Sequence, residues 1–585
     1  MSKLVLPVGT DSFSKIRSGN YYYIDKSLLI KQLVEEPKEV TLITRPRRFG
    51  KSLNMSMLDC FFNIDKKSEN LFDGLKISEH SDIYDEWKNN YPTIFISFKD
   101  VKDISYNGAL SLLKDVFSDF CDAHLEWSES DKINEYEKKY FNNLHFKNIS
   151  EDDLKSALFI LCRIAYKIYD KKVILLIDEY DVPIAQGNSK GYYDKIINIM
   201  STMYSKALKS NEYLNFAVVT GCLRIAKESI FTGLNNFQVD SIIDGLFEEF
   251  FGFTDEEINE LLSYYDMNDK KSEIKSWYDG YLFGEREVYC PWDVISYVDR
   301  YKRKPSFAPI NFWANTSSND IIRSFLDSDL DVNEEFETLL KGGYIKKIIN
   351  EDVTYKELIS KQSQQSENHN LQKNKLQPNE ENFWTILLMT GYLTIVPDTP
   401  DEAEERSKEG MYQVEFTLRI PNKEIMILFK DTVYAWFKDN VVNIDRTELI
   451  KAIWNSDENT LTQIIEGYIA DTISYYDYYE YFYHAFVTGL LLGVKGCTVK
   501  SNREAGTGRA DVIFKDRLHN RVAIFEVKRA ETENESLENL CSKGLAQIEK
   551  REYAKSFRGY KIYKYGISCY KKSCLVKASK DNFTD

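Results

Sequence analysis

The sequence predicts an α/β protein in which a parallel sheet covered by helices is followed by a helical lobe and then by a second α/β domain. Three observations lead to this prediction. Four short apolar runs alternate with helical stretches in the first part of the chain, which is typical of a parallel sheet with both faces covered. Short helices and aromatic-rich turns follow them. The last part of the chain then returns to alternating strands and helices.

The four apolar runs define the expected strands of the first sheet. A helical pattern follows the first run directly, so the chain reads strand, loop, helix at this point. Residues 102–170 are mostly helical in pattern and separate the second strand from the third. The expected strands lie at residues 39–46, 92–100, 171–181 and 214–221.

The length of 585 residues suggests about three or four domains. A polar stretch rich in Gln and Asn, at residues 360–382, is expected to form an exposed insertion. Together with the strand and helix patterns, this predicts four consecutive parts. They are a sheet-containing core at 1–245, a helical lid or small lobe at 246–350, a connecting region with the insertion at 351–440, and a final domain at 441–585 that opens with helices.

The composition fits neither a disordered nor a collagen-like chain, because 43% of the residues are hydrophobic and 29% are charged. The sequence contains no run of about 18 apolar residues, so it predicts no membrane-spanning helix. The N-terminal apolar patch is too short for a signal peptide. The nine cysteines include no C-x-x-C pair, and the six histidines show no metal-ligand spacing. We therefore expect a cytoplasmic protein without a zinc ribbon or a disulfide framework.

Charge is divided unevenly along the chain. The whole chain has a net charge of −16, yet residues 495–585 hold 20 Lys and Arg against 12 Asp and Glu. The other residues hold 56 against 80, so the C-terminal segment carries +8 and the remainder −24. A basic segment in an acidic protein indicates an anionic partner, although a lysine-rich surface also arises without one.

The stretch ITRPRRFGKSLN, residues 43–54, predicts a phosphate-binding loop between the first strand and its helix. In such a loop, backbone N–H groups surround the phosphates at a helix N-terminus, while Lys binds the β- and γ-phosphates and Ser binds Mg²⁺. Arg45 takes the place of the usual first glycine, so the loop has to open with a different backbone conformation. The residues expected at the nucleotide are Arg45, Pro46, Arg47, Arg48, Phe49, Gly50, Lys51 and Ser52.

Acidic residues end the third expected strand, and a polar residue ends the fourth. Asp178 is placed to hold Mg²⁺ together with Ser52, and Glu179 to polarise the attacking water. The alternative is that these acids only cap the strand. Thr220 is placed to sense the γ-phosphate, whereas Arg224 either contacts phosphate or forms a structural salt bridge. The sequence therefore predicts an ATP site with Mg²⁺.

Five motifs occur in a fixed order over roughly residues 5–300. They are GTDSFSKIRSGNYYYIDKSLLIKQL, RPRRFGKS, LLIDEYDVPI, VVTGCLRIAKESIFTGLNN and WYDGYLFG. Together they resemble the AAA-ATPase-like family of bacterial and mobile-element proteins. The usual loop of that family reads Arg-Pro-Arg-Arg-Phe-Gly-Lys-Ser, so Arg45 matches the family. The resemblance implies a P-loop NTPase core and a setting in bacterial defence or mobile-element biology.

Two strands joined by a polar turn, at residues 508–530, carry two acids and a lysine. Glu526 and Lys528 alternate with Val527, so they share one face of their strand. Asp511 begins the preceding strand and converges with Glu526 on one divalent metal if the two strands pair. Carboxylates suit Mg²⁺, with Mn²⁺ as the alternative, and a lysine beside them stabilises negative charge in phosphodiester hydrolysis. The competing interpretation is a surface strand whose charges serve solubility.

The segment GRADVIFKDRLHNRVAIFEVKRA resembles the PD-(D/E)xK nuclease superfamily, and the resemblance covers about residues 475–578. It implies a restriction-endonuclease-like α/β domain. The catalytic residues of the superfamily match Asp511, Glu526 and Lys528, and a glutamine that many members carry on a helix matches Gln547.

Three further positions belong to this resemblance. Ala510 stands where the superfamily name has proline, a position that varies widely and supplies no ligand. In the expected first helix, Glu480 is a candidate extra acid and His484 a structural residue. The aromatic stripe YYDYYEYFYH in the same region would pack into a core or stack on bases.

The two resemblances imply a protein that binds and hydrolyses ATP and couples this to a Mg²⁺-dependent nuclease domain, with DNA favoured over RNA as the substrate. A second hypothesis is a nucleotide-switched binding or signalling protein whose nuclease-like domain grips nucleic acid or a partner without cutting. A third, an ATPase scaffold without nucleic acid, leaves the C-terminal charge unexplained. No membrane partner is expected, and the sequence leaves the oligomeric state open.

Overall fold

The computed structural model describes residues 3–66, 70–225, 237–313, 333–351, 380–397, 415–441, 446–472, 480–505 and 508–579. The chain forms two compact units. The first comprises Met1–Thr316 and Tyr344–Met426, and the second Ser317–Gly343 and Ile427–Asp585. Most of the predicted polar insertion, residues 360–379, lies outside the described residues. The four-part division at residues 245, 350 and 440 stays a prediction.

The first unit contains a five-stranded parallel sheet in the order β2-β3-β4-β1-β5. Its first four strands in sequence confirm the four predicted apolar runs. The fifth was not predicted, because it spans only four residues, FQVD, and half of them are polar. The strands are β1 (Val40–Thr44), β2 (Thr93–Ser97), β3 (Val173–Asp178), β4 (Leu214–Gly221) and β5 (Phe237–Asp240).

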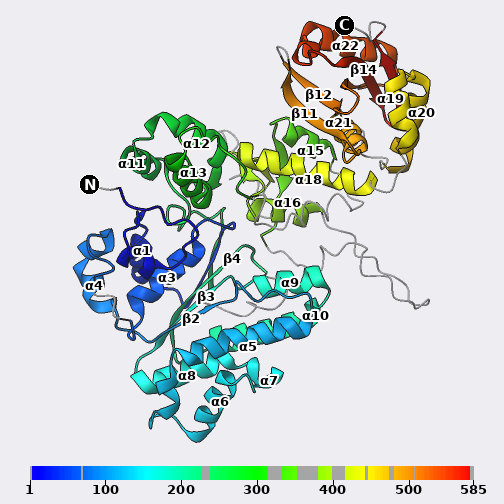
Figure 1. The fold of residues 1–585 in the computed structure, drawn as a ribbon. Coiled ribbons are helices and arrows are strands. Elements are labelled where there is room, and N and C mark those ends of the chain that lie inside the picture. Colours follow the sequence, from blue (N-terminus) through cyan, green and yellow to red (C-terminus); the bar gives the residue numbers. More distant parts are fainter. Residues whose placement is uncertain are drawn as a thin grey trace, which may run out of the picture. The chain divides into compact units, whose positions relative to one another are not determined.

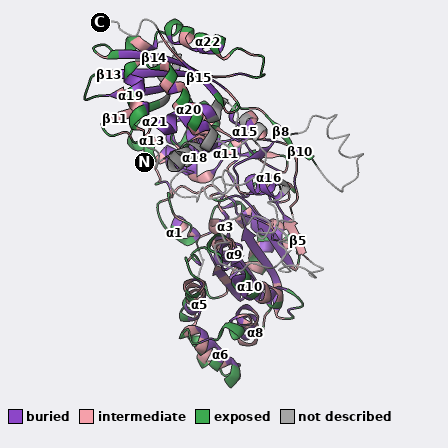
Figure 2. Ribbon diagram, turned by 90° about the vertical axis from the view of Figure 1, so that its right-hand side faces the viewer, coloured by how far each residue is buried: buried purple, intermediate pink, exposed green. Residues whose placement is uncertain are grey.

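Helices cover both faces of this sheet, with α3 on one face and α5, α9 and α10 on the other (Figure 1). Every residue of β1 and of β3 is buried, which explains why these strands read as continuous apolar runs (Figure 2). The predicted helical insertion between β2 and β3 is confirmed by α5 to α8. The helices are α1 (Phe13–Ser18), α2 (Leu28–Glu35), α3 (Lys51–Phe62), α4 (Ser81–Trp87), α5 (Tyr106–Asp122), α6 (Glu135–His145), α7 (Glu151–Leu154), α8 (Ala157–Tyr169), α9 (Val182–Lys190) and α10 (Tyr193–Leu208).

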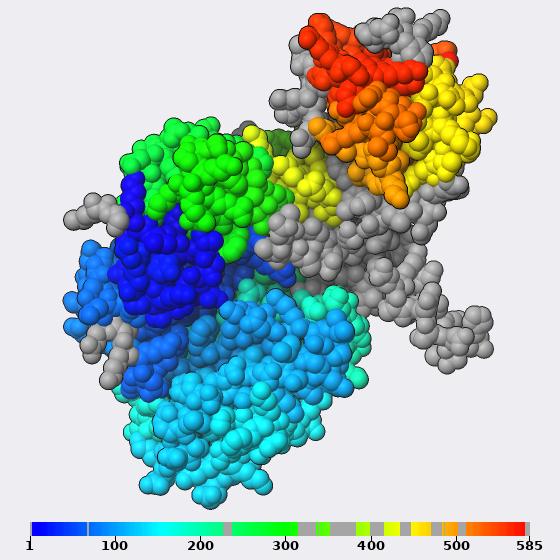
Figure 3. All heavy atoms as spheres, viewed as in Figure 1, coloured from blue at the N-terminus to red at the C-terminus, as the bar shows by residue number. Residues whose placement is uncertain are grey.

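A lobe follows the sheet, and residues near the start of the chain pack on it (Figure 3). Leu6 belongs to its core, and the Tyr265 hydroxyl donates to the Leu4 carbonyl at 2.9 Å. The lobe is helical as predicted, with an added hairpin of β6 and β7. Its elements are α11 (Asp255–Tyr265), α12 (Lys271–Tyr278), β6 (Tyr281–Phe283), β7 (Arg286–Val288) and α13 (Pro291–Arg303).

A small antiparallel sheet in the order β8-β10-β9 completes the described part of the first unit. Its strands come from the region that was predicted only as a lobe end and a connecting segment. The next helix, α18, begins in the first unit at Lys423 and continues in the second from Ile427. The elements are β8 (Ile345–Ile348), α16 (Glu380–Met389), β9 (Thr394–Ile395), β10 (Glu415–Arg419) and α18 (Lys423–Val441).

The second unit contains a five-stranded mixed sheet in the order β11-β12-β13-β14-β15. Only β13 and β14 are parallel, and α22 connects them. The predicted second α/β domain is thereby confirmed. The elements are α15 (Asn333–Leu340), α19 (Thr447–Asn455), α20 (Glu458–Thr472), α21 (Glu480–Leu491), β11 (Cys497–Ala505), β12 (Gly508–Asp516), β13 (Arg521–Arg529), α22 (Leu537–Lys550), β14 (Lys561–Tyr570) and β15 (Ser573–Ala578).

Alternation along β13 divides this sheet into two faces. Val527 packs with residues of α19, α20 and α21 in one apolar core, whereas Val522 and Ile524 pack with Ile548 of α22 in another. Glu526 therefore lies on the face that α22 covers. In the part of the chain that the structure describes, no helix is both long enough and apolar enough to cross a membrane.

Candidate functional sites

Polar side chains meet Asp178 at the carboxyl ends of the parallel strands. Ser52 in the first turn of α3 donates to Asp178 Oδ2 at 2.7 Å, and Ser97 at the end of β2 donates to the same oxygen at 3.1 Å. Thr220 on β4 donates to Asp178 Oδ1 at 2.7 Å. Burial and the neighbouring Glu179 charge raise the pKa of Asp178, against the effect of these hydrogen bonds. The structure thus brings together Ser52, Asp178 and Thr220, as predicted, and adds Ser97.

Lys51 lies beside this cluster and is held by the loop itself. Its Nζ donates to the carbonyl oxygens of Arg45 and Pro46, each at 3.0 Å, and lies 3.3 Å from Glu179 Oε1. Burial alone would lower the pKa of Lys51, but the Cys222 thiol and the Glu179 carboxylate raise it above its ordinary value. Glu179 has a φ of 54°, an uncommon conformation for a residue with a side chain. Lys51 and Glu179 therefore form an ion pair where a phosphate group is expected.

The backbone at the start of α3 has two features that favour a bound anion. Gly50 has a φ of 85° and stands immediately before α3, where no side chain caps the helix. Among the described residues, no side chain caps the first N–H groups of α3, and the helix dipole favours negative charge at this end. Arg47 is exposed at the loop surface, and Arg224 is half-buried after β4. Contacts of these two arginines with phosphate stay predictions.

Arg45 lies behind the loop, fully buried. Its guanidinium forms an ion pair with Asp240 of β5 at 2.5 Å and also donates to the Asp240 carbonyl at 2.9 Å. It stacks on the rings of Phe251 and Phe283, at 5.4 and 5.3 Å from their centroids. The residue that replaces the usual glycine thus ties the loop to β5, and this explains how the chain tolerates the replacement.

The side chains of Phe49 and Arg48 point into the lobe, and Pro46 is also enclosed by protein. The Phe49 ring lies 4.9 Å from that of Tyr281 and 5.0 Å from that of Phe283, and Pro46 packs beside Gly391. Arg48 lies over the rings of two tryptophans, as described below. The side chains predicted at the nucleotide therefore divide into two sets. Lys51 and Ser52 lie with Asp178, whereas Arg45, Pro46, Arg48 and Phe49 have protein surroundings.

Asp181 is a buried acid that the sequence analysis did not single out. Its Oδ2 accepts from the backbone N–H groups of Cys222 and Leu223, at 2.9 and 3.1 Å, and so fixes the loop after β4. Burial and the Glu179 charge raise the pKa of Asp181 to about 6. The signal was available, because DEYD carries a third acid after the predicted pair.

In the second unit, Asp511 and Glu526 lie on neighbouring antiparallel strands. Asp511 Oδ2 accepts from the Val527 N–H at 2.9 Å, which holds the two strands together at this point. Glu526 is completely buried, and Lys528 Nζ lies 3.1 Å from its Oε1. Burial and the Asp511 charge raise the pKa of Glu526 to about 7. The predicted acids and lysine therefore converge.

Helix α22 supplies the other side of this site. Gln547 donates to Glu526 Oε1, and Gly544, one turn earlier, packs beside Glu526. Tyr553 is buried nearby and hydrogen-bonds with Gln547, while the charges of Glu526 and Asp511 add to burial in raising its pKa. The position of Gln547 agrees with the prediction. Tyr553 was missed because nothing in its sequence surroundings marks it.

Of the predicted accessory residues, His484 lies near this site and contacts its backbone. His484 is buried, and its Nε2 donates to the Asp511 backbone carbonyl at 2.7 Å. The Glu480 side chain and Tyr475–Tyr479 of the aromatic stripe lie outside the described residues. Tyr483, at the described end of the stripe, is buried and donates to the Lys571 carbonyl. That end of the stripe packs in the core.

The donors at the second site fit a hard divalent cation. Glu526 Oε2 is buried and has no hydrogen-bond partner among the residues that the structure describes. A buried carboxylate oxygen without a donor is costly, and a cation would satisfy it. No group of three or more His, Cys, Asp and Glu arranged for a metal occurs in the described ranges. Asp511 and Glu526 thus offer a two-carboxylate set, which suits an ion that keeps water or substrate oxygens.

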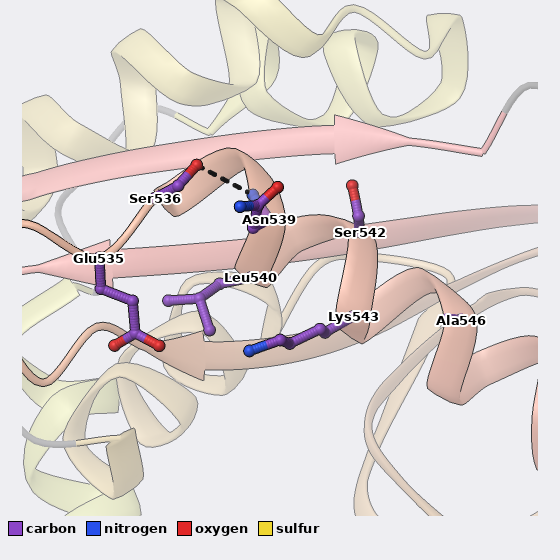
Figure 4. A pocket seen from close by; sticks show the side chains of 7 residues that line it. All are labelled: Glu535, Ser536, Asn539, Leu540, Ser542, Lys543 and Ala546. Carbon is purple, nitrogen blue, oxygen red and sulfur yellow. Dashed lines mark hydrogen bonds between the residues drawn. The ribbon is translucent and has the colours of Figure 1, made fainter.

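A surface hollow of about 450 Å³ lies at the start of α22 (Figure 4). The Asn539 N–H donates to Ser536 Oγ at 3.3 Å there, which caps the helix. Neither Gln547 nor the carboxylates line it, so it is separate from the site above. The lining residues are Glu535, Ser536, Asn539, Leu540, Ser542, Lys543 and Ala546.

The fold and the two sites define a protein with a P-loop ATPase-like part and a nuclease-like part. Residues 7–231 match the family described as predicted AAA-ATPase, and residues 478–579 match the PD-(D/E)XK nuclease superfamily. The chain therefore contains a predicted AAA-ATPase domain followed by a PD-(D/E)XK nuclease superfamily domain. Both resemblances seen in the sequence are confirmed.

A curated protein of Azotobacter chroococcum mcd 1, described as an uncharacterized protein in the vnfD 5' region, is similar to part of the chain. The two are 28% identical over 320 residues, which is 54% of this chain and 55% of that protein. The chain thus spans about half the length of the curated relative it matches. No solved structure matches the chain.

Proposed function

We propose that this protein is a nucleotide-controlled, metal-dependent nuclease that cleaves nucleic acid, with DNA as the preferred substrate. One observation carries the proposal. Glu526 is a fully buried carboxylate, one oxygen of which has no hydrogen-bond partner among the described residues, and it lies beside Lys528 and opposite Asp511. A structural role would leave that oxygen unsatisfied, whereas a divalent cation at the site satisfies it.

At the first site, Lys51 and Ser52 would bind ATP and Mg²⁺ together with Asp178. When bound, Mg²⁺ neutralises phosphate charge. The present contacts indicate what the chain's own groups do on binding. Lys51 leaves the Arg45 and Pro46 carbonyls for the phosphates, and this frees Glu179 to orient a water. Ser52 and Thr220 already converge on Asp178, so little rearrangement is needed there.

At the second site, Asp511 and Glu526 would hold Mg²⁺, with Mn²⁺ as the alternative. When bound, the ion neutralises the scissile phosphate and activates water. Gln547 fixes the orientation of Glu526 from α22. The Lys528 ammonium remains about a fifth exposed, so it can reach a phosphate group while still paired with Glu526. The basic balance of residues 495–585 favours a polyanionic substrate.

The test is cleavage of plasmid and single-stranded DNA, and of RNA, by the full chain with Mg²⁺ or Mn²⁺, with and without ATP. The decisive variants are Lys528→Ala at the second site and Lys51→Ala at the first. Lys543→Ala, an exposed lysine on α22, and Lys38→Ala, an exposed lysine before β1, are matched controls. We expect metal-dependent cleavage that Lys528→Ala abolishes and the controls retain.

The same assay separates the proposal from its alternative. A change in the ATP response of Lys51→Ala supports control by nucleotide. Binding of DNA or RNA without scission under any metal condition would contradict the nuclease and favour the second hypothesis, a nucleotide-switched protein that grips its partner. The setting in bacterial defence or mobile-element biology and the cytoplasmic location stay predictions.

A further inference from the structure

Arg48, a residue of the phosphate loop, lies in an aromatic pocket of the lobe. Its guanidinium carbon is 5.4 Å from the centroid of Trp292 and 5.6 Å from that of Trp313. Its side chain is 12% exposed, and Nη1 lies 3.7 Å from Asp293 Oδ1. The backbone has a φ of 74°, a conformation that a non-glycine residue holds only when its surroundings impose it. The lobe therefore fixes this part of the loop.

Two buried carboxyl groups lie behind Arg48. Asp293 accepts from Trp313 Nε1 at 3.0 Å, and Glu424 Oε1 accepts from the backbone N–H of Trp313 at 3.0 Å and from that of Phe312. With both groups ionised, Asp293 Oδ1 and Glu424 Oε2 would have no hydrogen-bond donor in the described parts of the chain, whereas a proton held between the two carboxyl groups supplies one. Burial and the Asp293 charge raise the pKa of Glu424 to about 10, so one of the two acids keeps a proton. Arg48 provides the positive charge that balances the carboxyl group that stays ionised.

Glu424 belongs to the first turn of α18, and a neighbouring residue both caps that helix and ties it to the lobe. Asn422 Oδ1 caps the helix by accepting from the Ile425 N–H at 3.1 Å, and Asn422 Nδ2 donates to the Asp279 carbonyl at 2.8 Å. From Ile427 onward the same helix belongs to the second unit, which carries the nuclease-like site. A continuous helix thus begins at the cluster that holds Arg48.

We propose that Arg48 is a positioning residue rather than a phosphate ligand, and that Arg48, Asp293 and Glu424 pass the nucleotide state of the loop to α18. The proposal rests on ATP binding at the loop. Phosphate binding rearranges the backbone around Gly50, two residues after Arg48, and so shifts the guanidinium within its pocket. Asp293 then loses or gains its counter-charge, and the hydrogen bonds that Glu424 makes at the start of α18 change with it.

The experiment is hydrogen exchange of the full chain with and without ATP and Mg²⁺, followed in peptides from Lys423–Val441. ATP binding is measured in parallel with a fluorescent ATP analogue. We expect ATP to change exchange in α18 of the wild type. Arg48→Gln and Asp293→Asn should still bind ATP, and far more tightly than Lys51→Ala, because in this proposal neither side chain binds phosphate, yet they should lose the response of α18. Arg303→Gln, an exposed arginine on the helix of Asp293, is the control and should respond normally.

Each other result counts against a defined part of this inference. If Arg48→Gln loses ATP as completely as Lys51→Ala, Arg48 is a phosphate ligand and the inference is wrong. If the wild type binds ATP but α18 does not respond, the coupling is absent. This second outcome needs no variant, so it holds even if a substitution prevents folding. If the wild type does not bind ATP at all, the proposed nucleotide site itself fails.

Discussion

The two candidate sites differ in how their charges are satisfied. In the first unit, Asp178 accepts three side-chain hydrogen bonds, and Lys51 is held by two carbonyls and Glu179. In the second unit, Glu526 is equally buried but keeps one oxygen without a partner among the described residues. A ligand at the first site has to displace contacts that the protein makes with itself. A cation at the second site supplies a contact that is missing.

The supports behind the sites differ as well. The phosphate loop is tied to β5 by the buried ion pair of Arg45 and Asp240, and to the lobe by Phe49 and Arg48. The carboxylates of the second site are held by the strand backbone and by Gln547. We therefore expect ligand binding at the first site to affect the surrounding lobe. The second site is held by its own sheet and by α22. Substitutions at each site test this contrast.

The ion pair behind the loop gives the largest effect. Asp240→Asn leaves Arg45 buried without its counter-ion, and breaking a buried pair in this way costs about 3–5 kcal/mol of unfolding free energy. The double variant Arg45→Met with Asp240→Asn removes the stranded charge and should recover most of that loss. Urea unfolding with hydrogen exchange of β1 and β5 peptides measures both.

Asp11→Asn is the surface control for this experiment. Asp11 pairs with Lys99, and both side chains are about half exposed. Its loss should cost no more than about 1 kcal/mol. An equal cost for Asp240→Asn and Asp11→Asn would show that the pair behind the loop does not hold it.

Glu526→Gln tests the missing contact of the second site. The substitution keeps the shape of the side chain and removes the charge that would bind the cation. Cleavage should fall by more than about 100-fold, because partners outside the first ligand shell alone account for 10–100-fold in metal sites. Glu538→Gln, an exposed acid on α22, should leave cleavage unchanged. Retained cleavage in Glu526→Gln would remove this residue from the metal site.

Gln547 and Tyr553 test whether α22 orients Glu526. Gln547→Leu and Tyr553→Phe each leave both carboxylates in place but remove part of the hydrogen-bonded chain that fixes Glu526. Each should lower the apparent affinity of the site for metal by about 10–100-fold, and a higher Mg²⁺ concentration should partly restore activity. No such rescue is expected for Glu526→Gln. Metal titrations of the three variants distinguish positioning from ligation.

The sequence predicted the residues whose roles follow from local spacing. Asp178 and Ser52 could be paired because parallel strands end at one edge of a sheet, and Glu526 and Lys528 because alternate strand residues share a face. Asp240 and Glu424 could not be found in this way. Asp240 lies about 195 residues from Arg45, and Glu424 about 111 from Trp313, so only the tertiary fold brings them together.

Arg45 shows the same limit of prediction from sequence. Its place in the motif predicted a contact with nucleotide, because sequence position alone cannot tell which way a loop side chain points. The structure directs it to β5. The lobe hairpin and β5 were missed for a related reason, since strands of three or four residues carry too little pattern to be recognised.

The smallest effect concerns the acid at the start of α18. Glu424 has an ordinary pKa of 4.5, which rises to about 10 in the folded chain through burial and the Asp293 charge. Between these values the folded chain holds a proton that the unfolded chain has lost. The unfolding free energy of the first unit therefore falls as the pH rises, by up to about 1.4 kcal/mol per pH unit from this group. The other ionisable groups around it are Asp293, Arg48, Cys290, Tyr278 and Tyr281.

Glu424→Gln removes that contribution, because glutamine is neutral at every pH. The stability of the variant relative to wild type should therefore increase from pH 6 to pH 9, as measured by urea unfolding at each pH. Burial raises the pKa values of Cys290, Tyr278 and Tyr281 above their ordinary ones, so these groups stay neutral over this range. If the unfolding free energies of the two proteins changed with pH in the same way, Glu424 would be ionised in the folded chain. Arg48 would then face two buried negative charges instead of one.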